Sequence, residues 1–264
     1  MADIKTGTSG YDYLDWVNNF YPQSISRKKF LYYYSNNFST VELNFTYYRL
    51  PQKTQIETFI KNSNPDMDFS IKGHESMTHR PNPATWKTNI QAYIQAVTPL
   101  LQSNRLAAVL LQFPYRFHYE KDNRLYLDKL LRELQELPLV VEFRNPHWLN
   151  RRTFEGLRQR EVGFCITDAP RIKGVPPTID ITTSKLAYIR FHGRNAQNWW
   201  DGNASSRFDY LYSQKELSSW ISRLKTLVKT AQKIRIYFNN HRKGQAPTNA
   251  QMLKNILEKA KITP

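Results

Sequence analysis

Short β-rich runs alternate with helix-patterned segments along the whole chain, and this alternation leaves few folds open to it. The runs with strand character lie at residues 3–9, 40–44, 68–74, 107–113, 139–144, 163–168, 186–193 and 233–241. Helical patterns lie between most of them, at residues 27–37, 52–63, 88–102, 124–137, 150–160, 213–232 and 246–261. Strands that alternate with helices typically form a parallel sheet with helical crossovers.

Eight strands and seven helices, without a long linker or a break in composition, predict a single (β/α)8 TIM-barrel domain over residues 1–264. The segment 169–185 contains three prolines and is expected to be irregular, so the helix after the sixth strand should be reduced or missing. A doubly wound open sheet is the structural alternative. It predicts a glycine-rich phosphate loop after the first strand, but "GTSGYDYLDW" contains neither GxGxxG nor GxxxxGK.

The charge balance points toward an anionic partner. The chain has 38 Lys and Arg residues against 22 Asp and Glu residues, which gives a net charge of +16. A basic surface without a specific role would explain this number, and so would binding of nucleic acid, phosphate or acidic lipid. The basic residues are scattered, so a disordered basic tail is not expected.

Cysteine usage and hydropathy predict a soluble cytoplasmic protein. The one cysteine, Cys165, lies in the apolar run "VGFCITD" and is expected to be a small buried core residue. A disulfide framework within the chain and a CxxC metal site are therefore not expected. The N-terminus has no apolar signal region and no run of 18 apolar residues occurs, so no membrane partner is expected.

Polar residues occur two positions apart where several strands are expected to end. The pairs are Glu42 with Asn44, Lys72 with His74, Glu142 with Arg144, Arg190 with His192, and Asn239 with His241, while Asn240, Gln112 and Asp168 also lie at strand ends. Alternate residues of a strand share a face, and barrel enzymes carry their active sites at the C-terminal ends of the strands. We therefore expect a ring of inward-facing polar side chains at one mouth, although one such strand end alone would suggest only a solvated terminus.

The connections that follow the strands are rich in aromatic residues. They carry Tyr11, Tyr13, Trp16, Phe20, Tyr21, Tyr115, Phe117, Tyr119, Trp148, Trp199, Trp200, Tyr210 and Tyr212. The segment 193–212 is long enough to form a lid over the same mouth.

Together these motifs resemble the domain of unknown function 72 family, also called YecE-like. The matching pieces are "GTSGYDYLDW", "FYP", "FSTVELNFTYYRLP", "FSIKGHESMTH", "LLQFP", "VVEFRNPHW", "ITDAP", "YIRFHGR" and "IYFNNHRKGQAPTNA", in the order of the family. The resemblance implies a TIM barrel but no activity. The signature residues that it carries over are Glu42, Asn44, Tyr47, Lys72, Gln112, Glu142, Arg144, Trp148, Asp168, Arg190, His192, Gly193, Asn239, Asn240 and His241.

The first functional hypothesis is an enzyme that acts by acid–base chemistry on a substrate bearing phosphate or carboxylate. Lys72, Arg144 and Arg190 would bind the anion, Glu42 or Glu142 would be the base, and His192 or His241 the acid. Further substrate contacts are expected from Asn44, Tyr47, Gln112, Trp148, Asn239 and Asn240. The structural alternative is an ion-pair network between Glu142 and Arg190, which is compatible with a site above it. No cofactor is expected.

Three other functions stay open. A metal-dependent phosphoesterase would use Glu142, Asp168, His192 and His241 as ligands, but the nearby arginines and the lack of HxH or HExxH spacing argue against it. A glycoside hydrolase would use Glu42 and Glu142 as its two carboxylates. A nucleic-acid-binding protein without catalysis would use the positive charge and exposed Tyr and Trp side chains.

Overall fold

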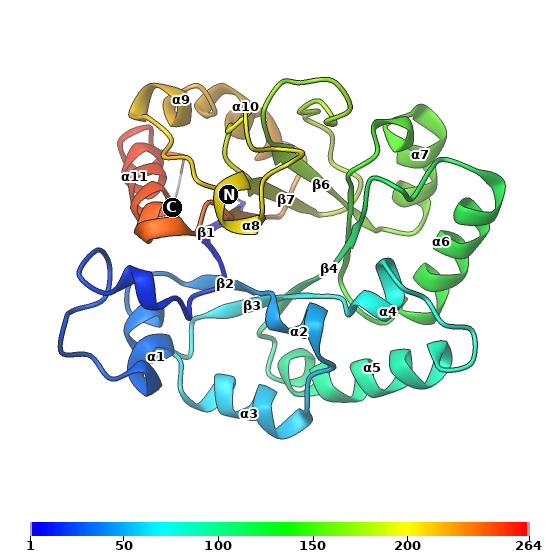
Figure 1. Cartoon of the computed structure of the whole chain (residues 1–264), viewed down its shortest axis with the longest axis horizontal. Helices are drawn as coiled ribbons and strands as arrows, with labels where there is room; N and C mark the ends of the chain where they lie inside the picture. Colours follow the sequence, from blue (N-terminus) through cyan, green and yellow to red (C-terminus); the bar gives the residue numbers. More distant parts are fainter. Residues whose placement is uncertain (1, 263–264) are drawn as a thin grey trace.

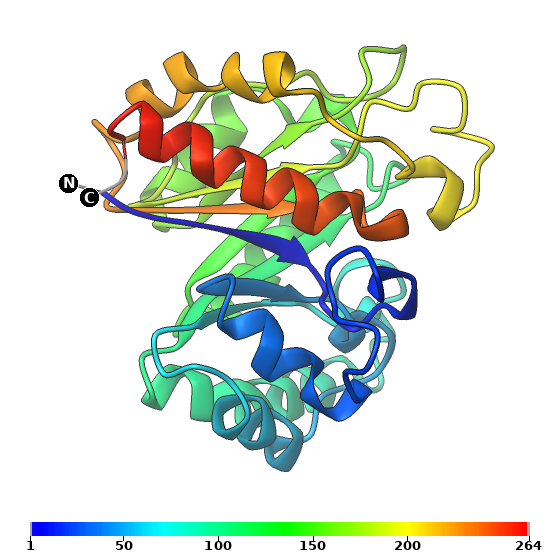
Figure 2. The same cartoon turned by 90° about the vertical axis from the view of Figure 1, so that its left-hand side faces the viewer.

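The computed structural model describes residues 2–262, and its strands form one closed parallel barrel (Figures 1 and 2). The eight strands follow sequence order around the barrel, and the first pairs with the last. They are β1 (Asp3–Ser9), β2 (Thr40–Leu43), β3 (Asp68–Lys72), β4 (Leu106–Phe113), β5 (Leu139–Phe143), β6 (Gly163–Asp168), β7 (Leu186–Phe191) and β8 (Lys233–Phe238). With helices between the strands, this is the TIM barrel that the sequence predicts.

Helices surround the barrel and connect most of its strands (Figure 1). They are α1 (Phe30–Ser35), α2 (Phe45–Tyr48), α3 (Lys53–Lys61), α4 (Glu75–Thr78), α5 (Trp86–Gln102), α6 (Lys121–Glu133), α7 (Arg151–Gln159), α8 (Ala204–Arg207), α9 (Gln214–Ser218), α10 (Ile221–Leu227) and α11 (Gln245–Lys259). Single 3-10 turns occur at η1 (Leu14–Trp16), η2 (Arg27–Lys29), η3 (Pro146–Trp148) and η4 (Arg242–Gly244). Within residues 2–262, no helix combines the length and the apolar character that a membrane span requires.

Two connections differ in how well they match the sequence pattern. Residues 169–185 contain no helix, as their three prolines predict. The helix expected over 213–232 is divided into α9 and α10, because the chain turns at Ser219 and Trp220. This turn lets the indole of Trp220 donate a hydrogen bond to Asp168 at 3.1 Å.

Five strands, β2, β3, β5, β7 and β8, end one to three residues before the positions that the sequence pattern predicts. The chain nevertheless follows the sheet a little further, since the backbone N–H groups of Arg144, His192 and Asn239 still donate to the neighbouring strand. Their side chains therefore keep the alternation of the strand. His74 does not, because its ring caps α4 by accepting a hydrogen bond from the Ser76 N–H.

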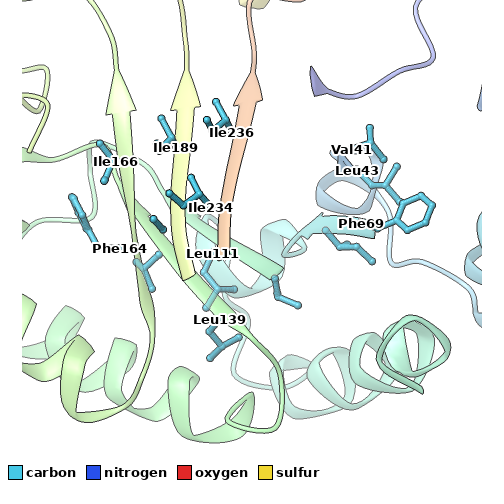
Figure 3. Packing of buried hydrophobic residues seen from close by; sticks show 14 of the residues in the cluster. Val41, Leu43, Phe69, Leu111, Leu139, Phe164, Ile166, Ile189, Ile234 and Ile236 are labelled. Carbon is cyan, nitrogen blue, oxygen red and sulfur yellow. The ribbon is translucent and has the colours of Figure 1, made fainter. Parts of the chain in front are cut away.

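Most of the apolar core lies between the outer face of the barrel and the helices (Figure 3). Val41, Phe69, Ile189 and Ile236 are among the strand residues that are fully buried there. A smaller cluster lies inside the barrel and consists of Ala108, Leu110, Val140, Cys165, Tyr188 and Tyr237. Cys165 is thus the buried core residue that the sequence predicts. Because the inner apolar cluster is small, polar side chains occupy much of the remaining interior.

Charged side chains fill the barrel near the N-terminal ends of its strands. The guanidinium of Arg235 is 2% exposed and pairs with Asp68 at 2.7 Å and with Asp3 at 2.6 Å. The ammonium of Lys5 lies 3.1 Å from the Asp68 carboxylate. Asp68 therefore compensates two cations at this end of the barrel, far from the strand ends that carry the predicted site.

We predict that Asp68→Ala lowers the free energy of unfolding by about 3–5 kcal/mol, because it leaves the buried Arg235 short of a partner. Asp180→Ala is the matched control, since it removes the partly exposed pair with Arg223 and should change stability by about 1 kcal/mol or less. Urea unfolding of both variants measures the two effects. Equal losses would contradict a structural role for the buried cluster.

Candidate active site at the barrel mouth

A cavity of about 550 Å³ opens at the C-terminal ends of the strands. The strand ends contribute Asn44, Lys72, Gln112, Arg144, Arg190 and Asn239 to its wall. The following loops contribute Tyr13, Tyr47, Tyr48, His79, Pro114, Tyr115, Val175, Pro176, Trp199, Trp200, Arg207, Phe208 and His241. Within the described part of the chain, this lining contains four Lys or Arg residues and no Asp or Glu.

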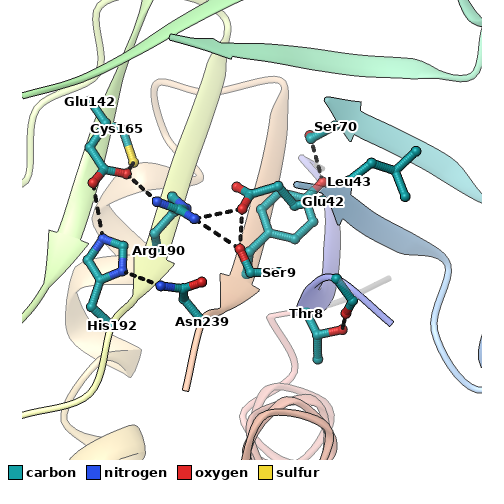
Figure 4. A network of polar contacts seen from close by, with 12 residues as sticks. Thr8, Ser9, Glu42, Leu43, Ser70, Glu142, Cys165, Arg190, His192 and Asn239 are labelled. Carbon is teal, nitrogen blue, oxygen red and sulfur yellow. Dashed lines mark hydrogen bonds and ion pairs between the residues drawn. The ribbon is translucent and has the colours of Figure 1, made fainter. Parts of the chain in front are cut away.

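Arg190 joins two carboxylates across the barrel, directly below the cavity (Figure 4). Its guanidinium lies 2.7 Å from Glu42 and 2.6 Å from Glu142. It also donates to the Ser9 hydroxyl at 2.9 Å, while the Tyr188 hydroxyl donates to Glu42 at 2.7 Å. Both carboxylates are fully buried. The ion-pair network between Glu142 and Arg190 is therefore present, and it extends to Glu42.

Arg144 completes the charge balance of this network. Its Nε atom lies 2.5 Å from Glu142, so two arginines offset the two glutamates. Burial alone would raise the pKa of Glu142, but Arg144, Arg190 and His192 hold it well below its usual range. Glu142 is therefore ionised at neutral pH, and because its pKa is so low it would be a weak general base, the role that the sequence suggested for it.

His192 lies beneath the cavity wall and is fully buried. Its Nδ1 atom accepts a hydrogen bond from the Asn239 amide at 3.2 Å, so its Nε2–H faces Glu142, also at 3.2 Å. Burial and the charge of Arg144 lower the pKa of His192 to about 3. The neutral ring consequently orients Glu142 and Asn239, and it does not itself line the cavity.

Lys72, Tyr47 and His79 form one wall of the cavity. The Nζ atom of Lys72 lies 4.3 Å from the centre of the Tyr47 ring, and the His79 ring packs edge-on to the Tyr47 ring with 4.8 Å between the ring centres. Lys72 keeps some exposure to the cavity, but burial and the charge of Arg190 lower its pKa to about 7. Burial and the charge of Lys72 lower the pKa of His79 to about 4. Both groups thus offer unprotonated nitrogen near neutral pH.

The segment 193–212 covers the mouth from one side, as its length predicts. It contributes Trp199, Trp200, Arg207 and Phe208 to the lining. Trp199 lies against the guanidinium of Arg144, with 5.7 Å between the Arg144 Cζ and the ring centre. The Nε atom of Arg207 is buried without a hydrogen-bond partner among the described residues. A polar atom in that position favours a ligand that supplies an acceptor.

Three of the residues predicted from the sequence lie outside both the cavity lining and the ion-pair network below it. Trp148 stacks on Phe143 and Phe117 at 4.5 and 5.1 Å, because it packs the loops onto the rim of the barrel. Asp168 accepts hydrogen bonds from the side chains of Arg194, Tyr212 and Trp220. Asn240 donates to the Tyr210 carbonyl and to Asn249. Asp168 and Asn240 therefore fasten the lid segment and do not face a substrate.

The remaining sequence-derived candidates fall into two layers. Asn44, Tyr47, Lys72, Gln112, Arg144, Arg190, Asn239 and His241 line the cavity, whereas Glu42, Glu142 and His192 lie below it. The four suggested metal ligands do not converge, and no group of three or more His, Cys, Asp or Glu side chains within residues 2–262 is arranged to hold a metal ion.

Sequence reasoning did not single out His79, Arg207 or Phe208, although all three line the cavity. His79 ends the motif "FSIKGHESMTH", and its place one short helix after a strand end was the available signal. Arg207 directly precedes Phe208 in the sequence of the lid segment 193–212. Its distance along the chain from every strand end gave no indication that it would reach the site.

Comparison with known proteins shows relatives along nearly the whole chain. The family model described as "Protein of unknown function DUF72" matches residues 5–264. UPF0759 protein YunF from Bacillus subtilis is 29% identical over 270 residues, which cover 97% of this chain and 95% of that protein. The crystal structure of a DUF72 family protein from Thermotoga maritima is 35% identical and covers 97% of this chain and 99% of its own, with a TM-score of 0.87. A DUF72 family protein from Enterococcus faecalis is 25% identical and covers 97% of this chain and 95% of its own, with a TM-score of 0.86.

We predict that His192→Gln reduces the loss of stability on acidification. The pKa of His192 is about 3 in the folded protein, so the unfolded chain, with a histidine pKa of about 6.5, binds the extra proton between these values. This difference costs the wild type up to about 1.4 kcal/mol per pH unit as the pH falls. Urea unfolding from pH 7 to pH 4 should therefore show the two stabilities converging, and parallel curves would count against a neutral buried ring.

Proposed function

This chain belongs to the DUF72 family, and we propose that it is an enzyme that acts by acid–base chemistry on a small substrate bearing a phosphate or carboxylate group. One observation carries the proposal: the cavity is lined by four cationic residues and by no carboxylate among the described residues. Glu42 and Glu142 together offset Arg190 and Arg144, so the charge of Arg207 has no compensating carboxylate among the described residues of the wall, and Lys72 adds to this charge in its protonated form. Such a cavity favours an anionic ligand.

Arg144 and Arg207 are the residues suited to bind the anion. They lie close enough that the charge of Arg207 contributes, after burial and the charge of Arg190, to the lowered pKa of Arg144. An anion between them would relieve this repulsion, and it would supply the acceptor that the Arg207 Nε atom lacks. Arg190 is less suited to this role, because both of its terminal nitrogens already bind carboxylates.

Lys72 and His79 are the residues suited to proton transfer. Their lowered pKa values, about 7 and about 4, leave unprotonated nitrogen available at neutral pH. A general base works best when its pKa lies near the pH of the reaction, and Lys72 meets this condition. Asn44, Gln112 and Asn239 add amide groups that can orient a polar substrate. Glu42 and Glu142 then act through Arg190 and Arg144 by holding them in place.

We predict that Arg207→Gln weakens the binding of an anion by about 10- to 100-fold, the effect of losing about 1.5–3 kcal/mol of charge-assisted hydrogen bonding. Calorimetric titration with inorganic phosphate, phosphoglycolate and malonate measures the change. Arg223→Gln removes the same charge from α10, where Arg223 pairs with Asp180, and should bind like the wild type. A wild type that binds none of these anions at millimolar concentration would refute the proposal.

A nucleic-acid-binding protein without catalysis is the second candidate, favoured by aromatic rings at the rim of the cavity. Tyr48, Tyr115 and Trp200 line the cavity and yet are 76%, 43% and 47% exposed. Exposed rings beside a basic cavity could stack on the bases of a single strand.

For this candidate we predict that a labelled single-stranded oligonucleotide binds with an affinity that falls steeply as salt increases. Tyr48→Ala with Trp200→Ala should weaken binding at every salt concentration, because the rings act by stacking, whereas Tyr32→Ala alters an exposed tyrosine outside the cavity and should not. Fluorescence anisotropy measures both effects. Absence of binding at low salt would eliminate the candidate and leave the enzyme.

A further inference from the structure

We propose that Lys72 is a nucleophile that forms an imine with an aldehyde or ketone bearing an anionic group. The inference rests on the proposed function, because it assigns the anion to Arg144 and Arg207 and adds the reacting group of the same substrate. It narrows the substrate class from small anions to anionic carbonyl compounds.

The position of Lys72 suits a nucleophile. It is the last residue of β3, and its carbonyl oxygen accepts hydrogen bonds from the hydroxyls of Thr46 and Tyr93 at 2.5 and 3.3 Å. The next residue, Gly73, still donates its N–H to the Leu110 carbonyl in the neighbouring strand. The backbone is thus fixed on both sides of the residue, and a side chain held by a rigid strand end positions its reactive atom well.

The amine of Lys72 has no counter-ion. No carboxylate within the described chain lies within ion-pair distance of its Nζ atom, whereas Lys5 on the same face of the barrel pairs with Asp68. The Nζ atom lies over the face of the Tyr47 ring, at 4.3 Å from the ring centre. An ammonium ion that is desolvated without a paired carboxylate gives up its proton readily.

Burial favours the unprotonated amine of Lys72, and the charges around it leave this effect in place. Arg190 and Arg144 disfavour the ammonium form, while Glu142 and Glu42 favour it but are themselves paired with these arginines. His79, whose ring also contacts the Tyr47 ring, is neutral at the same pH. Burial, which is the largest cause, and the charge of Arg190 bring the pKa of Lys72 to about 7. Desolvation and a neighbouring cation are the two known ways to activate a lysine for imine formation.

The reaction balances without an oxidant or a second substrate. The Nζ lone pair attacks the carbonyl carbon, and the carbonyl electron pair moves to oxygen, which takes up a proton while nitrogen loses one. The resulting carbinolamine then loses its hydroxyl group with one further proton, so that water leaves and the C=N bond forms. His79 lines the same cavity and is neutral at this pH, so it is suited to relay the proton in both steps. The imine makes neighbouring C–H bonds more acidic, which connects the covalent step with acid–base chemistry.

Pyridoxal 5′-phosphate is a suitable probe, because it is an aldehyde that carries a phosphate and its imine absorbs visible light. One equivalent is added at pH 7, the imine is reduced with borohydride, and the labelled peptide is identified by mass spectrometry. At pH 7 an amine with a pKa of 7 is unprotonated on the order of 10³ times more often than an ordinary lysine. We expect the label at Lys72, at least about 10-fold faster than at other lysines, with a rate that falls as the pH drops below 7.

Three variants make the test decisive. Lys72→Met should remove the fast label and keep the thermal unfolding midpoint, because an apolar chain of similar length replaces a desolvated amine. Lys72→Arg keeps the cation without an amine that can react, so it should lose the label while it still binds inorganic phosphate in calorimetry. Lys173→Met removes an exposed lysine of the loop after β6 and should label like the wild type.

The outcomes separate this inference from the proposed function. If the label spreads over surface lysines, or if Lys72→Met is labelled as fast as the wild type, the inference that Lys72 is a nucleophile is overturned. If the wild type still binds phosphate in that case, the proposed anion site stands. A second outcome is that pyridoxal, which lacks the phosphate, labels Lys72 equally fast and that the protein does not bind phosphate. This outcome supports the nucleophile and overturns the anion site. Fast labelling of Lys72 that depends on the phosphate supports both.

Discussion

The ion pairs between Arg190 and the carboxylates of Glu42 and Glu142 determine how the centre of this barrel is built. Removing such charges from water costs several kcal/mol for each ion, and the cost is offset only where the pairing geometry is good and the remaining lone pairs are satisfied. No two of β2, β5 and β7 pair directly with each other, so each must keep its register with the strands between them for these ion pairs to form. A slip by one residue in any of them would turn a charge toward the apolar layer under the helices. The network thus specifies the position of the strand ends that carry the cavity.

The barrel could be predicted because strands alternate with helices along the chain, and the inward-facing ring could be predicted because side chains alternate between the two faces of each strand. Depth within the mouth was not predictable in the same way. His192 comes two residues after Arg190, and yet it is the more deeply buried of the two with respect to the cavity. The reason lies in the lid segment, which turns at Gly193 (φ 86°) and returns Trp199 and Phe208 to within 6.3 and 5.9 Å of the His192 ring centre. Contacts of that kind depend on where a loop folds back.

Two of the predicted site residues lie outside the cavity lining for the same physical reason. Trp148 follows a strand end as a substrate-binding aromatic residue would, but its stack combines Phe143 of the same strand with Phe117 from the connection after β4. Asp168 ends a strand as a metal ligand would, but its partner Arg194 comes from the connection after β7. In both cases a side chain from another connection satisfies the residue, and no spacing rule within one strand end reveals that partner. His79 and Arg207 are the converse, since loops bring them to the cavity from positions without a local pattern.

The charge pairing below the cavity also governs what the cavity can do. If one of the two glutamates were paired with Lys72, it would stabilise the ammonium form, and the amine would be unreactive at neutral pH. Instead Glu42 and Glu142 are both committed to guanidinium groups, which remain charged at any pH at which the protein is folded. Lys72 is therefore a basic group at this mouth whose protonation responds to a ligand.

An incoming anion would stabilise the charged form of Lys72, whereas an incoming carbonyl would consume its neutral form. A substrate that carries both groups in one molecule avoids this conflict when Arg144 and Arg207 hold the anion away from the amine.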